Sequence, residues 1–521
     1  MSEAADEQLE LVRSGEPDDT TAGTPDVATS AAHGVLWLTA QKWVVRLGGL
    51  LTMAILTRFL RPEEFGVMAA ATAVAPLIYL LSDMGFSTYI VQADDADQDT
   101  LVSGFWFSVI AGAILSGALW VAAPGLGLLF GLPAVVPIIQ WLTLSVAFVS
   151  VASVPTAILR RRMAFRALAF QTVVGALAAQ ASALCLVVMG AGIWALVTQY
   201  IVSQAVTCVL AWRSARWRPT GKPSAHRIVV MARFGTKVVA VEFVAVARAW
   251  GETAVIASWA GAAALGYYSI AQRLVQVLQD LSVSAIIPVS TVSIARLRDD
   301  ASRLRSFYLT ALHATYAGVS PLMALVAIGA SVVIPAVFGA GWSPSVVPFQ
   351  FLAVAGILAI GAALDHGLFY GLGQPGLWFT YAVVTDAVTL GTTAVLVRFG
   401  LPAIALGFVG VTLLATLARW FLLRRVILLS AKAMARPLLL TAAAVVPAAG
   451  FGWAIMRLSS GLPQVIALGL GGLGLLIMHA LIVRAVTPDV FRTVLRVLPA
   501  RLSKPVLQLA RLNPPVAVRR R

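Results

Sequence analysis

The sequence contains little charge and little cysteine for a chain of 521 residues. Only 12% of the residues are charged, whereas a soluble domain carries about 25%, and 59% are hydrophobic with a mean hydropathy of +0.88. So few charges cannot cover the surface of a large soluble protein, and that class is excluded. The composition indicates a polytopic membrane protein.

Residues that carry out catalysis or bind metals are also scarce. The two cysteines lie inside apolar runs and the five histidines are isolated, which excludes a disulfide scaffold and a clustered Cys or His metal site. The sequence holds no nucleophile–base pair, no Gly-rich phosphate loop and no metal-binding motif. It therefore predicts neither an enzyme nor a cofactor, and ATP hydrolysis by this chain is unsupported.

The excess of basic residues follows the pattern of membrane topology. The formal net charge is +15, but Lys and Arg lie between apolar segments, so nucleic acid is not an expected partner. One alternate set of connections, with the C-terminal tail, holds 26 of them, and the other set holds only Arg58, Arg61, Arg398 and Arg457. Because loops rich in Lys and Arg stay in the cytoplasm, both termini are predicted to be cytoplasmic.

Fourteen apolar segments are long enough to cross a bilayer as helices. They cover residues 35–57, 66–91, 101–123, 134–159, 167–189, 191–212, 229–259, 262–294, 306–334, 345–371, 376–397, 403–423, 438–457 and 463–485. The connections between them are short, so no extramembrane domain is expected. The predicted fold class is an all-α polytopic membrane protein with about 14 transmembrane helices.

A faint internal repeat suggests how these helices are organised. At an offset of 200 residues, Phe65-Gly66 aligns with Leu265-Gly266, and a few further positions match. We therefore expect two six-helix lobes and an additional C-terminal helix pair. The predicted divisions are a disordered acidic cytoplasmic tail (1–33), an N-terminal lobe (34–212), a basic cytoplasmic linker (213–228), a C-terminal lobe (229–425), the thirteenth and fourteenth helices (426–487) and a basic cytoplasmic tail (488–521).

Ionisable residues inside the apolar segments are candidates for function, because each costs about 2.5–3.5 kcal/mol at bilayer depth unless it meets a partner or water. They lie on one face of each of three segments: Lys42 and Arg46 in the first, Arg233, Lys237, Arg248 and Glu252 in the seventh, and Arg273 and Asp280 in the eighth, where the polar Ser269 and Gln276 complete a stripe. The first and seventh segments are counterparts in the repeat. Their basic faces therefore indicate one shared cavity that suits an anionic head group such as diphosphate.

A structural explanation stays open for several of these residues. Lys42 and Arg233 can mark helix ends, with their charged groups extended to the interface. Arg273 and Asp280 can form an ion pair across two turns of their own helix. Arg46 and Arg248 lie deeper in their segments and are the preferred cavity residues.

Several motifs, in the same order over about residues 34–425, resemble those of the Wzx-type exporters of lipid-linked oligosaccharides. These motifs are ILTRFLRPEEFGVMAAATAV (55–74), LLSDMGFSTYIVQ (80–92), PTAILRRRMAFRALAF (155–170), GAGIWALVTQY (190–200), LGYYSIAQRLVQ (265–276) and VFGAGWSPSVVPFQFLAVAG (337–356). The chain is identified as a member of this family of polysaccharide transporters, in the branch of colanic-acid and teichuronic-acid exporters. The family is part of the multidrug/oligosaccharidyl-lipid/polysaccharide flippase superfamily. The acid-rich run at Asp94, Asp95, Asp97 and Asp99 departs from the family's pattern.

The resemblance implies two lobes in a V around a central cationic cavity, in a multi-pass protein of the bacterial inner membrane. The implied activity is the flipping of a polyprenyl-diphosphate-linked oligosaccharide to the outer leaflet by alternating access. Membrane lipids and a polymerase or glycosyltransferase complex are the other expected partners. We expect the diphosphate to contact Arg46, Arg248 and Arg273, with Lys42 and Lys237 as secondary contacts. Glu252 and Asp280 are expected to orient these cations or to engage a coupling ion.

Three other functions compete with this one. A cation-coupled antiporter of drugs or small molecules, from the same superfamily, needs an acidic cavity, whereas the first segment carries Lys42 and Arg46 and no acid. A polymerase or ligase of polysaccharides needs a large outer loop with catalytic charge, and every predicted outer loop is short. A scaffold without transport activity, in a cell-wall synthesis complex, stays open.

Overall fold

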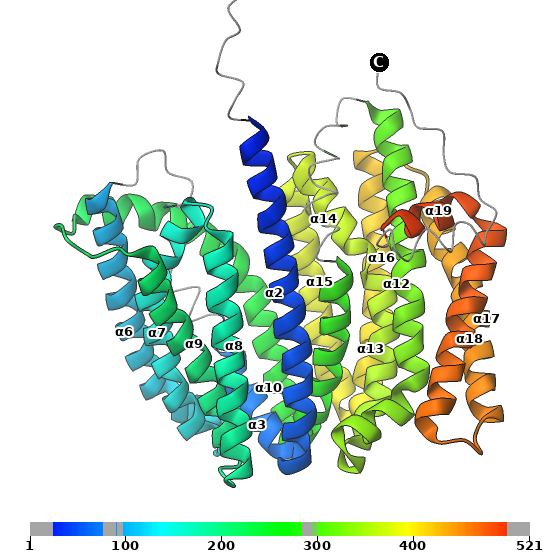
Figure 1. The fold of residues 1–521 in the computed structure, drawn as a ribbon, viewed down its shortest axis with the longest axis horizontal. Coiled ribbons are helices and arrows are strands. Elements are labelled where there is room, and N and C mark those ends of the chain that lie inside the picture. Colours follow the sequence, from blue (N-terminus) through cyan, green and yellow to red (C-terminus); the bar gives the residue numbers. More distant parts are fainter. Residues whose placement is uncertain are drawn as a thin grey trace, which may run out of the picture.

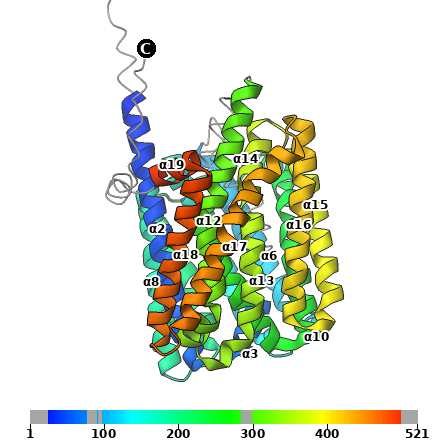
Figure 2. The same ribbon diagram turned by 90° about the vertical axis from the view of Figure 1, so that its right-hand side faces the viewer.

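The fold is a bundle of long helices (Figures 1 and 2). The computed structural model describes residues 24–74, 76, 90, 97–283, 294, 297 and 300–497. Within these residues every regular element is a helix and none is a strand. The predicted all-α membrane fold is confirmed.

The first half of the described chain forms two helical hairpins and the two helices that precede them. The bounds are α2 (Thr24–Phe59), α3 (Pro62–Ala73), α6 (Gln98–Leu129), α7 (Val135–Arg161), α8 (Phe165–Val188) and α9 (Trp194–Ala215). α6 packs against α7 and α8 packs against α9, because each pair is joined by a short turn. α2 packs on α8 and α3 packs on α7, so the four helices of the hairpins lie together on one side of α2 (Figure 1).

The second half begins with α10 (Ala225–Val283), which contains the predicted span 229–259 and the described part of the span 262–294. They meet at Gly261, whose φ of +85° only glycine adopts without strain. Glu252 and Tyr268 lie in hydrogen-bond contact on either side of this turn, so the two limbs of α10 run antiparallel.

The helices after α10 form one packed group. The bounds are α12 (Ala301–Phe338), η2 (Ala340–Ser345), α13 (Val346–Ala359), α14 (Gly361–Gly371), α15 (Pro375–Leu396), η3 (Val397–Phe399), α16 (Leu401–Val426), α17 (Ala431–Leu458), α18 (Gln464–Val486) and α19 (Pro488–Val497). α12 packs against α13 and α17, α13 packs against α16, and α17 packs against α18. The short α19 packs on α12 and α18, at the same end of the bundle as the start of α2 (Figure 1).

Eleven of the described helical segments are long and apolar enough to cross a membrane, which agrees with a multi-pass membrane protein. They match the predicted spans from 101–123 onward, with α10 counted once for two spans. The first predicted span lies in α2, and the second begins in α3 and continues outside the described residues. The span predicted at 345–371 is divided at Ile360 into α13 and α14. The count of fourteen stays a prediction.

The predicted N-terminal tail is too long. α2 begins at Thr24, so residues 24–33 are helical, while residues 1–23 lie outside the described part of the chain. Thr24-Pro25 precedes a segment with several alanines, and this pattern suits a helix start because Pro is tolerated in the first turn and Ala has the highest helix propensity. The polar composition of the segment concealed that start.

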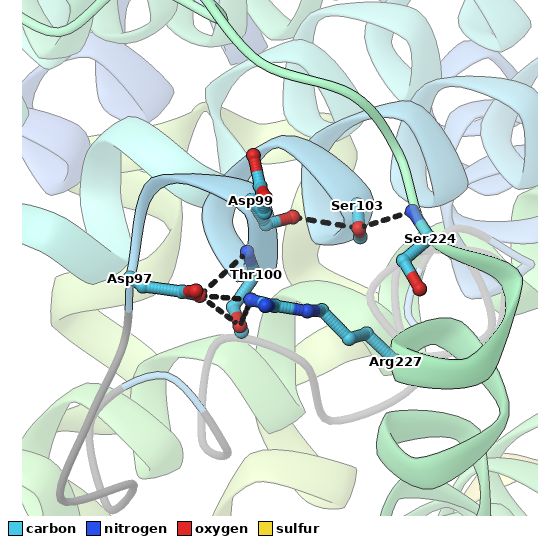
Figure 3. A network of polar contacts seen from close by, with 6 residues as sticks. All are labelled: Asp97, Asp99, Thr100, Ser103, Ser224 and Arg227. Carbon is cyan, nitrogen blue, oxygen red and sulfur yellow. Dashed lines mark hydrogen bonds and ion pairs between the residues drawn. The ribbon is translucent and has the colours of Figure 1, made fainter.

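The connection from α9 to α10 is held against the start of α6 by a group of polar contacts that we call the linker clasp (Asp97, Thr100, Ser103, Ser224 and Arg227; Figure 3). The Asp97 carboxylate accepts a hydrogen bond from the Thr100 amide at 3.0 Å, which caps α6, and it pairs with the Arg227 guanidinium. The Ser224 amide donates to the Ser103 hydroxyl at 2.8 Å. The clasp therefore ties the linker between the predicted lobes to the first of them.

The Asp97 carboxyl stays ionised in the clasp at any physiological pH. The pKa of Asp97 is lowered from 3.8 to about 2 by hydrogen bonds from the Thr100 hydroxyl, the Arg227 guanidinium and the Thr100 amide. Because the folded-state value is the lower one, the stabilisation is complete above about pH 4 and is lost as the pH falls through about 2. Protection of the linker is therefore expected to be the same at pH 6 and pH 8.

Replacing Asp97 with asparagine is expected to release the linker, because the ion pair to Arg227 is lost while the backbone of α6 is unchanged. Trypsin should then cut the detergent-solubilised protein several-fold faster after Arg216, which lies in this connection and is not followed by proline. Asp489→Asn is the matched control, because its carboxylate is largely exposed and pairs with Arg492 at 3.6 Å, far from the linker in the sequence. Equal cleavage rates in both variants would contradict a role of the clasp in holding the linker.

Candidate functional site

The second limb of α10 carries the predicted polar stripe on an accessible face. Arg273 and Gln276 in this stripe are exposed and Ser269 and Asp280 are half-buried, whereas Ile270, Ala271 and Val277 on the opposite side are buried. The stripe therefore faces away from the apolar core of the bundle. Two groups of charges lie on either side of this limb.

The first group, the Arg46 cluster, consists of Arg46, Arg273 and Asp280. Arg46 on α2 forms an ion pair with Asp280 on α10. Arg273 is exposed although protein surrounds most of it, and it lies close enough to Arg46 and Asp280 to interact with both charges. Among the described residues, no hydrogen bond or ion pair engages the Arg273 guanidinium.

The second group, the Arg248 cluster, joins both limbs of α10 to α15. Arg248 lies 2.9 Å from the Glu252 carboxylate and 3.0 Å from that of Asp386 on α15. Glu252 is buried and accepts further hydrogen bonds from the Tyr268 hydroxyl at 3.1 Å and the Gln272 amide at 3.3 Å. Glu252 thus fixes the orientation of Arg248, and Arg248 is shared between two carboxylates.

The three predicted cavity arginines lie at a similar depth. With a rise of about 1.5 Å per residue, Arg46 is about 18 Å along α2 from Arg58 in its last turn. Arg248 is about 20 Å and Arg273 about 18 Å along α10 from the turn at Gly261. Both reference points lie at one end of the bundle, since residues near them are in contact there. The three residues therefore lie about 18–20 Å from that end of the bundle, a distance shorter than the thickness of a hydrocarbon layer, which is about 30 Å.

The remaining predicted site residues are only partly accounted for. Lys42 lies on α2 one turn beyond Arg46 and is exposed. Lys237 and Arg233 lie on α10, and their side chains are outside the described part of the protein. The ion pair considered between Arg273 and Asp280 is not formed, because Asp280 pairs with Arg46 across to α2 instead. Binding of a substrate by any of these residues stays a prediction.

A further ion pair between apolar helices was missed by the sequence analysis. Arg419 on α16 lies 3.1 Å from the Asp365 carboxylate on α14, and both side chains are 3% exposed. The Tyr308 hydroxyl on α12 also donates to Asp365, and Arg419 donates to the Thr416 hydroxyl at 2.9 Å. The signal for this pair was available, because Arg419 lies inside the predicted span 403–423 and a charge there needs a partner.

Comparison with known proteins now decides the family. A family model described as polysaccharide biosynthesis protein matches residues 55–347, more than half of the chain. The chain belongs to this family of polysaccharide biosynthesis proteins. The match begins in α2, includes both limbs of α10 with the stripe, Arg248 and Glu252, and ends in α13, before Asp386. The predicted family resemblance is confirmed.

Two curated members of this group of proteins and one solved structure illustrate the similarity. The succinoglycan biosynthesis transport protein ExoT of Rhizobium meliloti is 24% identical over 372 residues, which cover 71% of this chain and 75% of that protein. The lipopolysaccharide biosynthesis protein WzxC of Escherichia coli is 25% identical over 335 residues, or 62% and 67% of the two chains. The solved structure, the lipid II flippase MurJ in an inward closed conformation, superposes with a TM-score of 0.69 at 12% identity, over 87% of this chain and 99% of that one. The MurJ likeness concerns the fold.

Proposed function

We propose that this polysaccharide biosynthesis protein moves a polyprenyl-diphosphate-linked oligosaccharide across the membrane by alternating access. The observation that carries the proposal is Arg273, which is exposed in a helix of membrane-spanning length, next to the Arg46–Asp280 pair, and whose guanidinium has no hydrogen-bond or ion-pair partner among the described residues. An arginine held in this way suits a diphosphate, because guanidinium donors match phosphate oxygens in a bidentate geometry. Two further findings support the proposal: the chain belongs to a family of polysaccharide biosynthesis proteins, and its relative ExoT is named a transport protein.

The orientation forms part of this proposal. The connections rich in Lys and Arg, including the linker held by the clasp, would face the cytoplasm together with both termini. The substrate would then be loaded from the cytoplasmic leaflet and released on the outer one. Its polyprenyl chain would remain in lipid, and the glycosyltransferases and polymerase that make and extend the glycan are the expected protein partners.

Deletion of the gene tests the proposed function directly. Intact vesicles of the deletion strain are treated with an impermeant probe, which reports the leaflet that holds any diphosphate-linked oligosaccharide. The lipids are then extracted and analysed. We expect this lipid to accumulate in the inner leaflet while a surface polymer is lost. Unchanged lipids with an altered sensitivity to cationic drugs would overturn the proposal in favour of an antiporter.

A further inference from the structure

Two glycines that are 200 residues apart bring α3 and α10 into backbone contact. A Cβ atom on Gly66 would lie 1.8 Å from the Ala262 carbonyl oxygen, and one on Gly266 would lie 2.0 Å from the Pro62 carbonyl oxygen. No carbon atom approaches a backbone oxygen so closely, and neither backbone can move without shifting its helix. Only glycine at both positions permits this contact, which we call the glycine crossing (Gly66 and Gly266 with Pro62 and Ala262).

The glycine crossing is reciprocal. Gly66 faces Ala262, which precedes Gly266 by four residues, and Gly266 faces Pro62, which precedes Gly66 by four residues. This is the pattern of an isologous interface, in which the same patch of two equivalent units meets around a local two-fold axis. The two halves of the chain therefore meet here through equivalent positions of their α3 and α10 helices.

Further contacts, made by Trp342 and Arg58, close the same end of the bundle. The indole of Trp342 lies between Phe65 and Tyr267, with ring centroids 5.1 and 5.8 Å away. Its N–H donates to the Thr57 carbonyl at 3.1 Å, and the Arg58 Nε donates to the Val337 carbonyl at 3.3 Å. Helices from both halves of the chain thus converge at the end that carries few basic connections.

We propose that the glycine crossing is the closing contact of the outer gate, a statement that rests on the proposed transport function. For release to the outer leaflet, the two halves must separate at this end. In this contact the backbones of small residues approach closely, and no side chains interlock between the two helices. The helices can therefore separate and meet again without rearranging side chains. A methyl group on either glycine would hold α3 and α10 apart and favour the outward-open state.

The test measures access to this end from outside. In a background with Cys185→Ser and Cys208→Ala, a reporter cysteine replaces Ala70, which is fully buried one turn from Gly66 on the same face of α3. Right-side-out vesicles are treated with a membrane-impermeant maleimide. We expect at least about tenfold faster labelling with Gly66→Ala, and the same with Gly266→Ala, because an overlap of the size found here must separate the helices. Gly117→Ala on α6 is the control, since nothing lies within 4 Å of its added methyl group.

Each result of this test is decisive. Unchanged labelling in both glycine variants would overturn the gate, and so would faster labelling with undiminished export, because a carrier that cannot close cannot complete its cycle. If the glycine variants are not inserted, Arg58→Ala replaces them. Arg58 has an exposed side chain whose hydrogen bond to Val337 helps to close this end, so its removal should also speed labelling. The labelling needs no substrate, so failure of the gate is distinguished from failure of the transport function, which the deletion strain reports.

Discussion

Export in a strain that carries Arg273→Ala is expected to fall by about 10- to 150-fold, while the protein stays inserted in the membrane. Hydrogen bonds to a charged group contribute about 1.5–3 kcal/mol, and the variant would lack the hydrogen bonds that Arg273 donates to the diphosphate. Its removal breaks no hydrogen bond or ion pair among the described residues, so the fold should tolerate the change. The measurement is complementation of the deletion strain, read as surface glycan and as inner-leaflet lipid.

Matched variants separate a binding role from a general effect of charge. Arg457→Ala removes an arginine near the end of α17 that stacks on Trp453 at 5.2 Å, and it should leave export unchanged. Arg273→Lys keeps the charge but loses the bidentate geometry, so it should restore only part of the activity. The double variant Arg46→Ala with Arg248→Ala should abolish export. Normal export by this double variant and by Arg273→Ala would disprove the assignment of the diphosphate site.

Removal of either partner of the Asp365–Arg419 pair is expected to destabilise the protein by about 3–5 kcal/mol, because one charge is then left buried without compensation. Both side chains are 3% exposed, and they join α14 to α16 with Tyr308 of α12. Asp365→Leu or Arg419→Met should therefore lower the thermal unfolding midpoint in detergent strongly. The midpoint is followed by the loss of the monodisperse species after heating.

The double variant Asp365→Leu with Arg419→Met provides the control for this second prediction. A buried ion pair can be replaced by apolar side chains at little cost, since the desolvation of both charges is removed together with their attraction. The double variant should accordingly be more stable than either single one. A double variant whose loss of stability equals the sum of the two single losses would show that the two charges do not act as a pair.

Features that depend on local sequence were predictable. The apolar segments gave the helices, and the turn between the seventh and eighth segments falls at Gly261 because a left-handed conformation there favours glycine. The four residues of the stripe from Ser269 to Asp280 lie outside the buried core, because residues three and four apart share a helix face. Each of these inferences needs only the residues within one helix or one turn.

Partners on distant helices were not predictable from one sequence. Nothing in the sequence selects α15 as the helix that brings Asp386 to Arg248, and the pairing of Asp280 with Arg46 in place of Arg273 depends on how α2 packs. The acid-rich run after the second span looked anomalous by composition. Asp97 in that run pairs with Arg227 in the linker, so part of the departure from the family's pattern has a structural reason.

The sharing of Arg248 between two carboxylates has an electrical consequence. The three arginines of the Arg46 and Arg248 clusters are matched by three carboxylates, so these six groups carry no net charge when no substrate is bound. An empty carrier of this kind would return across the membrane without moving their charge through the field. A carrier loaded with diphosphate would move negative charge outward, and a potential that is negative inside favours this movement by up to about 2.3 kcal/mol per charge for each 100 mV. The membrane potential would then contribute to the direction of export.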